Sequence, residues 1–328
     1  MKFRALGNTG IELSVIGLGA WAIGGGGYRF GWGVQNDTDS ISTIHRAIDM
    51  GINWIDTAPI YGDGRSEVII GNSLKKIRDK IIISTKCGLH MAPNNENIAI
   101  NLKKAALRQD IEASLKRLQT DFIDLYQIHI PSSDEDNLEA WGILESLKKE
   151  GKIRCAGLSN FDLNQLKQLH RIFPISFIQP MYNMLDTMIE TEILEFCKTN
   201  HIGVIVYSPM YRGLLTGQFN NKRVQDLGDD DNRSLLDFFK EPFLTANLEL
   251  VEQLRSIAHR NNKSVAHLAI AWVLRRSEIT SAIVGARKPS QIEETASAGD
   301  WQIPEADMLE LNELLSNHYT RLENLKSC

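Results

Sequence analysis

The stretch that decides the fold is NWIDTAPIYG, at residues 53–62. It begins with a short apolar run that is typical of a buried strand, and Pro59 and Gly62 then end any regular structure. Asp56 therefore stands at the carboxyl end of a strand, and Tyr61 lies in the loop that follows. A capping Asp beside a packed Tyr would give the same pattern, so the meaning of the pair depends on the rest of the chain.

The same unit, an apolar strand followed by a polar loop and an amphipathic helix, recurs along the chain. Strands are expected at 15–18, 53–56, 81–85, 122–128, 155–158, 177–179, 204–207 and 282–284. Helices are expected at 40–50, 66–76, 107–118, 138–149, 163–172, 189–199, 248–261, 265–276 and 289–297. Parallel strands need crossovers of this length, and eight such units close into a barrel. The pattern predicts a (β/α)8 TIM barrel made by residues 1–328 as one domain, with an open doubly wound sheet as the alternative.

Several segments lie outside these units. Residues 3–14 surround a turn cluster and predict an amino-terminal β-hairpin. Gly17 and Gly19 follow an apolar run, but the third glycine of a dinucleotide fingerprint is missing, so a Rossmann fold is not expected. The glycine-rich residues 24–33 are interpreted as a pocket wall, and the long connection 212–245 as a lid with a solvated acidic triplet at 229–231. A last helix is expected at 305–317, followed by a polar tail.

Composition narrows the function classes. The 328 residues are 43% apolar and 23% charged, and no apolar run approaches the roughly 18 residues of a membrane span. The start of the chain does not resemble a secretory signal, so a cytoplasmic protein is expected. A net charge of −5 without a basic cluster argues against nucleic acid as a partner. The four cysteines are scattered, which indicates reduced thiols and no zinc site.

Ionisable residues close three successive predicted strands. Asp56 ends the second strand, Lys86 the third and His129 the fourth. Because the strand ends and following loops of such a barrel form its active-site face, these side chains should converge with Tyr61 at one mouth. Any one of them would usually be a capped or snorkelling residue, but three in succession favour a catalytic site.

With these residues in place, the sequence resembles the aldo-keto reductase superfamily over essentially its whole length. The family's four catalytic residues match Asp56, Tyr61, Lys86 and His129. Its cofactor-binding stretches resemble GLSNF at 157–161, Gln179, YSP at 207–209 and GARKPSQIEE at 285–294. Two positions depart from the common pattern: Thr295 replaces an Asn that holds adenine, and Met210 replaces a commoner Leu.

The resemblance implies roles for the cofactor-binding residues. Ser159, Asn160 and Gln179 would bond the nicotinamide carboxamide, and Tyr207 would stack on its ring. The other residues implied to contact cofactor are Gly19, Ala20, Trp21, Ser208, Pro209, Met210, Gly213, Leu214, Gly285, Arg287, Gln291 and Glu294. NADPH/NADP+ is favoured over NADH because Arg287 and Lys288 could pair with a 2′-phosphate.

The chemistry explains why these residue types are needed. Carbonyl reduction requires a hydride on carbon and a proton on oxygen, and the nicotinamide supplies only the hydride. A phenol with a pKa of about 10 releases its proton reluctantly, whereas a nearby ammonium stabilises the phenolate. Lys86 is the candidate ammonium, Asp56 its counter-ion, and a neutral His129 would orient the substrate oxygen.

Three functions remain open at this stage. The sequence favours a reductase of small carbonyl compounds, or an alcohol or sugar dehydrogenase working in reverse. A cofactor-binding regulatory subunit with vestigial activity is the main alternative. A metal-dependent hydrolase or aldolase is disfavoured by the single His and the lack of paired carboxylates. Neither the substrate nor the oligomeric state follows from the sequence.

Overall fold

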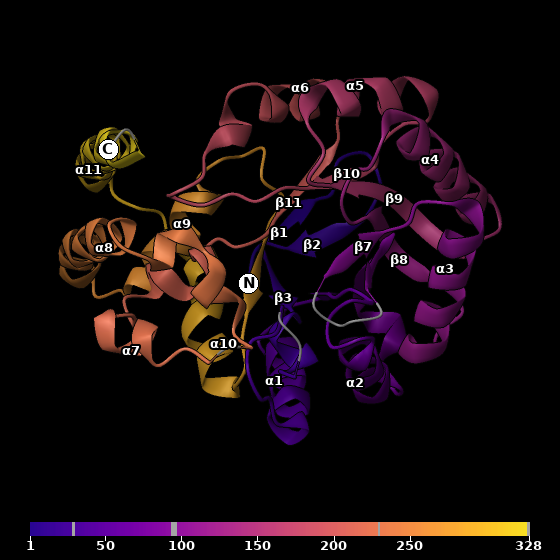
Figure 1. Cartoon of the computed structure of the whole chain (residues 1–328), viewed down its shortest axis with the longest axis horizontal. Coiled ribbons are helices and arrows are strands. Elements are labelled where there is room, and N and C mark those ends of the chain that lie inside the picture. The colour runs from indigo at the N-terminus through magenta and orange to yellow at the C-terminus, as the bar shows by residue number, and fades with distance from the viewer. Residues whose placement is uncertain (28–29, 93–96, 229, 327–328) are drawn as a thin grey trace.

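The computed structural model describes residues 1–27, 30–92, 97–228 and 230–326. At its centre, eight parallel strands form a closed barrel in which the last strand pairs with the first (Figure 1). These strands are β3 (Ile16–Gly19), β4 (Trp54–Asp56), β5 (Ile82–Cys87), β8 (Ile123–Ile128), β9 (Ile153–Ser159), β10 (Phe177–Gln179), β11 (Gly203–Val206) and β12 (Ser281–Gly285). Each expected strand overlaps one of them, so the predicted (β/α)8 barrel is confirmed.

Helices surround the barrel (Figure 1). They are α1 (Asp37–Asp49), α2 (Arg65–Leu74), α3 (Lys104–Leu118), α4 (Asp134–Lys149), α5 (Leu163–Ile172), α6 (Ile193–Thr199), α7 (Asn221–Gln225), α8 (Phe243–Arg260), α9 (Val265–Leu274), α10 (Pro289–Ala296) and α11 (Glu305–Lys326). Local signals explain several starts: the Asn36 side chain caps α1, and Asp162 forms a capping box with Gln165 at α5.

Two of the expected helices differ from the structure. The segment expected as one helix at 189–199 is a 3₁₀ turn at Met188–Glu190 followed by α6. The last helix does not give way to a polar tail at 317 but continues to Lys326, while 327–328 lie outside the described residues. It continues because its inner face stays packed: Leu322 is buried, and the Tyr319 hydroxyl donates to the Met184 carbonyl at 2.6 Å.

The predicted amino-terminal hairpin is confirmed. Strands β1 (Phe3–Ala5) and β2 (Glu12–Ser14) pair antiparallel, and their hairpin carries Leu6 and Leu13 into the barrel interior. Leu6 packs directly against the backbone of Gly203, the first residue of β11. The hairpin therefore closes the end of the barrel at which the strands begin. A second hairpin, β6 (Leu89–Met91) with β7 (Ile98–Ile100), follows β5 and was not expected.

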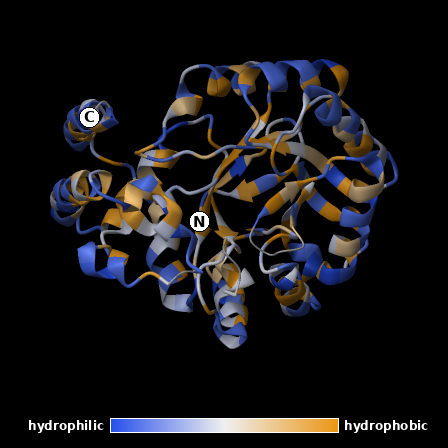
Figure 2. Cartoon of the chain, viewed as in Figure 1, coloured by the Kyte–Doolittle hydropathy of each residue, from blue (hydrophilic) through white to orange (hydrophobic). Residues whose placement is uncertain are grey.

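Apolar residues fill the barrel and the layer beneath the helices, and hydrophilic residues lie on the outer helix faces (Figure 2). The fully buried Trp54 indole occupies the space beside Gly17, where an added Cβ would lie 2.0 Å from the ring. The indole NH donates to the Ser14 carbonyl and the Ser281 hydroxyl, both at 3.1 Å. Gly17 thus makes room for a core tryptophan, which agrees with the rejection of a Rossmann fingerprint.

At the other end, the long connection after β11 meets the glycine-rich segment. Besides α7, it contains 3₁₀ turns at Tyr211–Thr216, Asn232–Leu235 and Asp237–Phe239. Trp32 and Asp231 form an antiparallel bridge, and the Asn232 NH donates to the Gly31 carbonyl at 3.1 Å. Residues 28, 29 and 229 of these two segments lie outside the described part. Across that part, none of the helices combines the length and apolarity needed to span a membrane.

The β1–β2 hairpin, which closes the end of the barrel where the strands begin, yields a stability prediction. Replacing Leu6 by Ala should lower the free energy of unfolding by about 2–5 kcal/mol, because the site is fully buried and cannot collapse onto the backbone of Gly203. Phe3→Ala in the same hairpin is the control and should lower it by at most about 1 kcal/mol, since Phe3 is 48% exposed. Urea unfolding measures both, and equal losses would show that Leu6 does not plug the barrel.

Candidate active site

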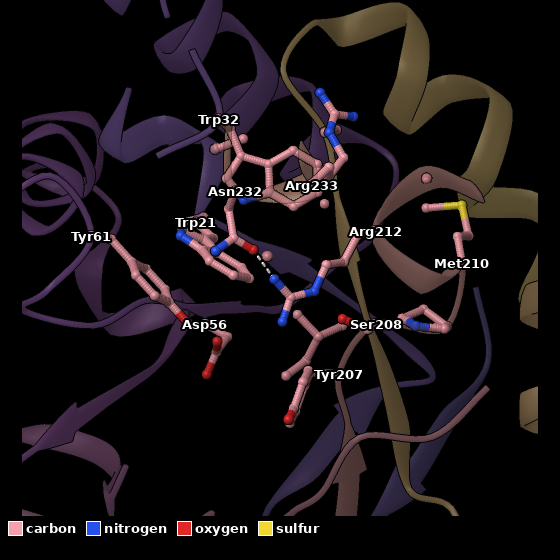
Figure 3. Close-up of a pocket in the computed structure, with 18 of the residues that line it drawn as sticks. Trp21, Trp32, Asp56, Tyr61, Tyr207, Ser208, Met210, Arg212, Asn232 and Arg233 are labelled. Atoms are coloured by element: carbon pink, nitrogen blue, oxygen red, sulfur yellow. Dashed lines mark hydrogen bonds between the residues drawn. The ribbon is translucent and has the colours of Figure 1, made fainter. Parts of the chain in front are cut away.

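A cavity of about 750 Å³ opens where the barrel strands end (Figure 3). Most residues expected from the sequence line it: Gly19, Ala20, Trp21, Asp56, Tyr61, His129, Ser159, Asn160, Gln179, Tyr207, Ser208, Pro209, Met210, Gly213, Gly285, Arg287, Gln291 and Glu294. Lys86 is buried behind Asp56 and Tyr61. The structure does not bring Leu214 to the cavity, because its fully buried side chain packs into the core under the loop.

A buried ion pair joins the neighbouring strands β4 and β5. The Lys86 ammonium donates to the Asp56 carboxylate at 2.7 Å and to the Thr57 carbonyl at 2.8 Å. Asp56 also accepts hydrogen bonds from the Ser84 hydroxyl at 2.9 Å and the Gln179 amide at 2.7 Å. Each charge therefore has a charged partner and further polar partners, the arrangement that a buried ion pair requires.

Tyr61 lies next to this pair. Its hydroxyl is 3.5 Å from the Lys86 ammonium, which lies 5.2 Å from the centre of the phenol ring. The ring stacks on Trp21 with centroids 5.8 Å apart and meets His129 edge-on at 6.2 Å. The loop has little freedom here, because Gly24 packs against the Tyr61 and Gly62 backbone, where a Cβ would lie 2.6 Å from the Tyr61 carbonyl carbon. The three residues at the ends of strands two to four therefore converge with Tyr61, as the sequence predicts.

The surroundings set the charge states of two of these groups. Burial lowers the pKa of Lys86, and the carboxylates of Asp56 and Glu67 oppose that shift. Burial and the nearby Lys86 charge hold the pKa of His129 well below its ordinary value. His129 is therefore a neutral imidazole at neutral pH, and it can exchange a hydrogen bond with a ligand without adding a charge.

Polar residues at the ends of β9, β10 and β11 form a connected network. The Asn160 amide donates to the His129 carbonyl at 2.9 Å and to the Ser159 hydroxyl at 3.0 Å. The Tyr207 hydroxyl donates to the Asn160 side-chain oxygen at 2.7 Å, and the Ser159 hydroxyl to the Gln179 carbonyl at 2.9 Å. The network reaches Asp56 through Gln179. It places amide and hydroxyl groups beside the catalytic candidates, where a planar amide ligand would find both donors and acceptors.

The long loop contributes residues that sequence analysis missed. Arg233 pairs with Asp231 at 2.5 Å and lies over Trp32, with its guanidinium carbon 4.7 Å from the ring centre. Arg212 bonds to the Asn232 side chain and lies 5.0 Å from the Trp21 ring (Figure 3). The acidic triplet is not simply solvated, since Asp231 is paired and Asp230 accepts from the Gly27 NH at 3.2 Å. Asp229 lies outside the described residues.

The far end of the cavity is built by the turn after β12 and the start of α10. The Gln291 side-chain oxygen accepts from the backbone NH of Arg287 at 2.7 Å and of Lys288 at 3.3 Å, which orders the turn. Arg287 lines the cavity, while Lys288 is exposed outside it. Burial and the neighbouring Arg233 lower the pKa of Arg287, as expected when two cations approach one space. This end can therefore hold an anionic group.

Comparison with known proteins agrees with this geometry. The Aldo/keto reductase family model matches residues 15–316. The aldo-keto reductase YhdN of Bacillus subtilis (strain 168) is 38% identical over 320 residues, or 97% of this chain and 94% of that protein. The NADH-specific methylglyoxal reductase of Escherichia coli (strain K12) is 36% identical over 327 residues, or 96% and 98%. The solved glycerol dehydrogenase AKR11B4 from Gluconobacter oxydans has a TM-score of 0.85 at 35% identity, covering 96% of this chain and 95% of that one.

The ion pair yields a prediction about stability. Lys86→Met and Asp56→Asn should each lower the free energy of unfolding, Lys86→Met by about 3–5 kcal/mol because it leaves a buried carboxylate without its cation. The double variant should lose less than the two single variants together. Lys103→Met, which breaks the exposed Lys103–Asp136 pair, is the control and should change little because solvent screens that pair. Strictly additive losses would mean that Asp56 and Lys86 do not stabilise each other.

Proposed function

This chain belongs to the aldo/keto reductase family, and from that premise we propose that Tyr61 is the acid and base of its reaction. The protein is a nicotinamide-dependent oxidoreductase that interconverts a carbonyl compound and its alcohol. The cofactor, when bound, supplies or accepts the hydride. The observation that carries the proposal is the Tyr61 hydroxyl, which lines the cavity 3.5 Å from a buried ammonium. We take residues 1–328 to act as one domain in this reaction.

The proton path uses the chain's own groups. Tyr61 donates its hydroxyl proton to the carbonyl oxygen of the substrate in reduction and takes a proton back from the alcohol in oxidation. Lys86 stabilises the phenolate that remains, because opposite charges at this distance attract strongly where water is scarce. Asp56 keeps the lysine charged and fixed, and its other donors, Ser84 and Gln179, fix the carboxylate in turn. His129, neutral and edge-on to Tyr61, orients the substrate oxygen.

Other residues would hold the cofactor. The donors and acceptors of Ser159, Asn160 and Gln179 suit a carboxamide, and the Tyr207 ring beside them suits stacking on a nicotinamide. We propose that the rest of the cofactor contacts the remaining cavity residues that the family resemblance implies: Gly19, Ala20, Trp21, Ser208, Pro209, Met210, Gly213, Gly285, Gln291 and Glu294. Because Gln179 donates to Asp56, its amide also connects the carboxamide subsite to the ion pair.

For the cofactor itself, we propose NADPH over NADH. Arg287 lines the far end of the cavity, and an arginine fork matches a 2′-phosphate. Arg233, which is paired with Asp231, lies near the same region and contributes to the lowered pKa of Arg287. One relative is NADH-specific by name, so the family alone does not decide this point. The convergence of all four catalytic candidates supports an enzyme, and no feature of the site favours a purely regulatory subunit.

The direct test is a titration of the protein with NADPH by fluorescence, followed by a panel of aldehydes, ketoses and polyols. Absorbance of the nicotinamide reports turnover. Binding with turnover supports the proposal and ranks the substrate classes, whereas binding without turnover on every compound would favour the regulatory alternative. Failure to bind would mean that the proposed cofactor residues are wrong.

Tyr61→Phe should lower turnover by about 10²–10⁴-fold, the contribution expected of general acid catalysis. NADPH binding should remain nearly intact, because only the hydroxyl is removed. Tyr126→Phe is the matched control: its phenol is buried in the core, outside the cavity lining, and turnover should be unchanged. Wild-type turnover in the Tyr61 variant would remove this residue as the acid.

Arg287→Gln tests the cofactor preference. The wild-type protein should show a lower Michaelis constant for NADPH than for NADH, and the variant should lose most of that difference. The expected change is on the order of tenfold, since hydrogen bonds to charged groups are the stronger kind. Lys288→Gln is the neighbouring control, because Lys288 is exposed outside the cavity lining. Comparable Michaelis constants for the two cofactors in the wild type would refute the preference.

A further inference from the structure

Gln35, between the glycine-rich segment and α1, makes an unusual set of contacts. It is only 8% exposed, although it belongs to a connecting loop. Its side-chain oxygen accepts from the Arg287 guanidinium at 2.8 Å, and its amide nitrogen donates to the Arg287 carbonyl at 2.9 Å. One amide thus holds both the side chain and the backbone of an arginine that is 252 residues away in the sequence.

The contacts with Gln35 do not use the two terminal nitrogens of the Arg287 guanidinium. A guanidinium has five N–H groups. Gln35 takes the single Nε–H, and the Val34 carbonyl takes one hydrogen of Nη2. Among the described residues, none accepts a hydrogen bond from the other three N–H groups. They include one N–H on each terminal nitrogen, and this pair forms the fork that binds two phosphate oxygens. The anchored arginine can therefore meet a phosphate with its end already aligned.

Gln35 is itself fixed from two further sides. Its backbone carbonyl accepts from Arg65 at 2.9 Å, and its amide nitrogen also donates to the Ser40 hydroxyl at 3.1 Å. Arg65 in turn bonds to the Ile23 carbonyl at 3.1 Å and pairs with Asp37. The position of the Gln35 amide is thus determined by the fold, and little rotamer freedom remains to be lost when a ligand binds.

The uncharged nature of Gln35 is as important as its position. A glutamate here would accept the same hydrogen bond, but its charge would neutralise Arg287 and repel a phosphate. The amide orients the guanidinium while leaving its full charge available to the cavity. Asp231, whose charge raises the pKa of Arg287, is already engaged by Arg233.

We propose that Gln35 is a positioning residue that makes this site selective for a cofactor carrying a 2′-phosphate, by holding the Arg287 fork toward the adenosine end of the cavity. The inference rests on the proposed preference for NADPH and adds a residue to it that does not itself line the cavity. Gln35 should affect the affinity for NADPH and leave the affinity for NADH unchanged, because the two cofactors differ only in the 2′-phosphate.

The test measures the dissociation constants of NADPH and NADH for the full-length protein by quenching of tryptophan fluorescence, to which Trp21 and Trp32 in the cavity wall contribute. Gln35→Leu should weaken NADPH binding on the order of tenfold, as expected when a charged group loses its hydrogen-bonding partner. Gln35→Glu should weaken it at least as much, although the side chain keeps its size and its acceptor. Neither variant should change the dissociation constant of NADH by more than about twofold.

Controls separate this role from a general structural one. Ser40→Ala removes the contact of Gln35 with α1 without touching Arg287, and its ratio of NADPH to NADH affinity should match that of the wild type. Competition by adenosine 2′,5′-bisphosphate and by adenosine 5′-monophosphate repeats the comparison without the nicotinamide end. If Gln35→Leu does not fold, Gln35→Asn, which is one methylene too short to span to Arg287, answers the same question.

The outcomes distinguish the inference from its premise. Equal affinity of the wild type for NADPH and NADH would overturn the proposed cofactor preference, and the role of Gln35 with it. A wild type that prefers NADPH, together with Gln35 variants that keep the preference while Arg287→Gln loses it, would overturn the role of Gln35 alone. A parallel loss of both affinities would show that Gln35 only stabilises the fold.

Discussion

The buried ion pair between Lys86 and Asp56 is the constraint on which the rest of the site depends. Removing two charges from water costs several kcal/mol per ion, so the pair persists only if the surroundings supply further polar partners. Those partners come from around the ring: Lys86 and Ser84 from β5, Asp56 from β4 and Gln179 from β10. A sheet that did not close would not bring β10 to β4. Closure of the barrel therefore also assembles the polar group around Asp56 and Lys86.

The two ends of the barrel differ in composition: the end where the strands begin is apolar, and the end where they finish is polar. Where the strands begin, large apolar side chains fill the interior, and small residues make space for them: an added Cβ on Gly157 would lie 2.4 Å from the Phe177 ring, as one on Gly17 would meet Trp54. This dry, densely packed floor is stabilised by apolar burial. It supports a polar mouth whose groups satisfy one another by hydrogen bonds.

The sequence predicts what is encoded locally. Alternation of apolar runs with amphipathic helices places all eight strands, and the position of Asp56, Lys86 and His129 at strand ends predicts their convergence, because parallel strands point one way. Contacts between distant segments leave no such signal. In the sequence, Arg233 cannot be told from other polar loop residues, and only the fold places it between Trp32 and Phe219. Likewise, Gln35 meets Arg287 only because β12 pairs with β3 to close the barrel. The sequence predicts too short a last helix because the residues after 317 are mostly polar, whereas the buried Leu322 keeps that stretch helical.

The glycine-rich segment and the residues beside it contact both Tyr61 and Arg287. At one end Gly24 packs on the backbone of Tyr61, and at the other Gln35 holds Arg287. Arg65, four residues after Tyr61, bonds to carbonyls at both ends of the segment, at Ile23 and Gln35. Tyr61, the proposed proton donor, thus contacts one end of this segment, and Arg287, the proposed phosphate-binding residue, contacts the other. In the proposed reaction, the same loop therefore positions both the residue that donates the proton and the residue that binds the 2′-phosphate.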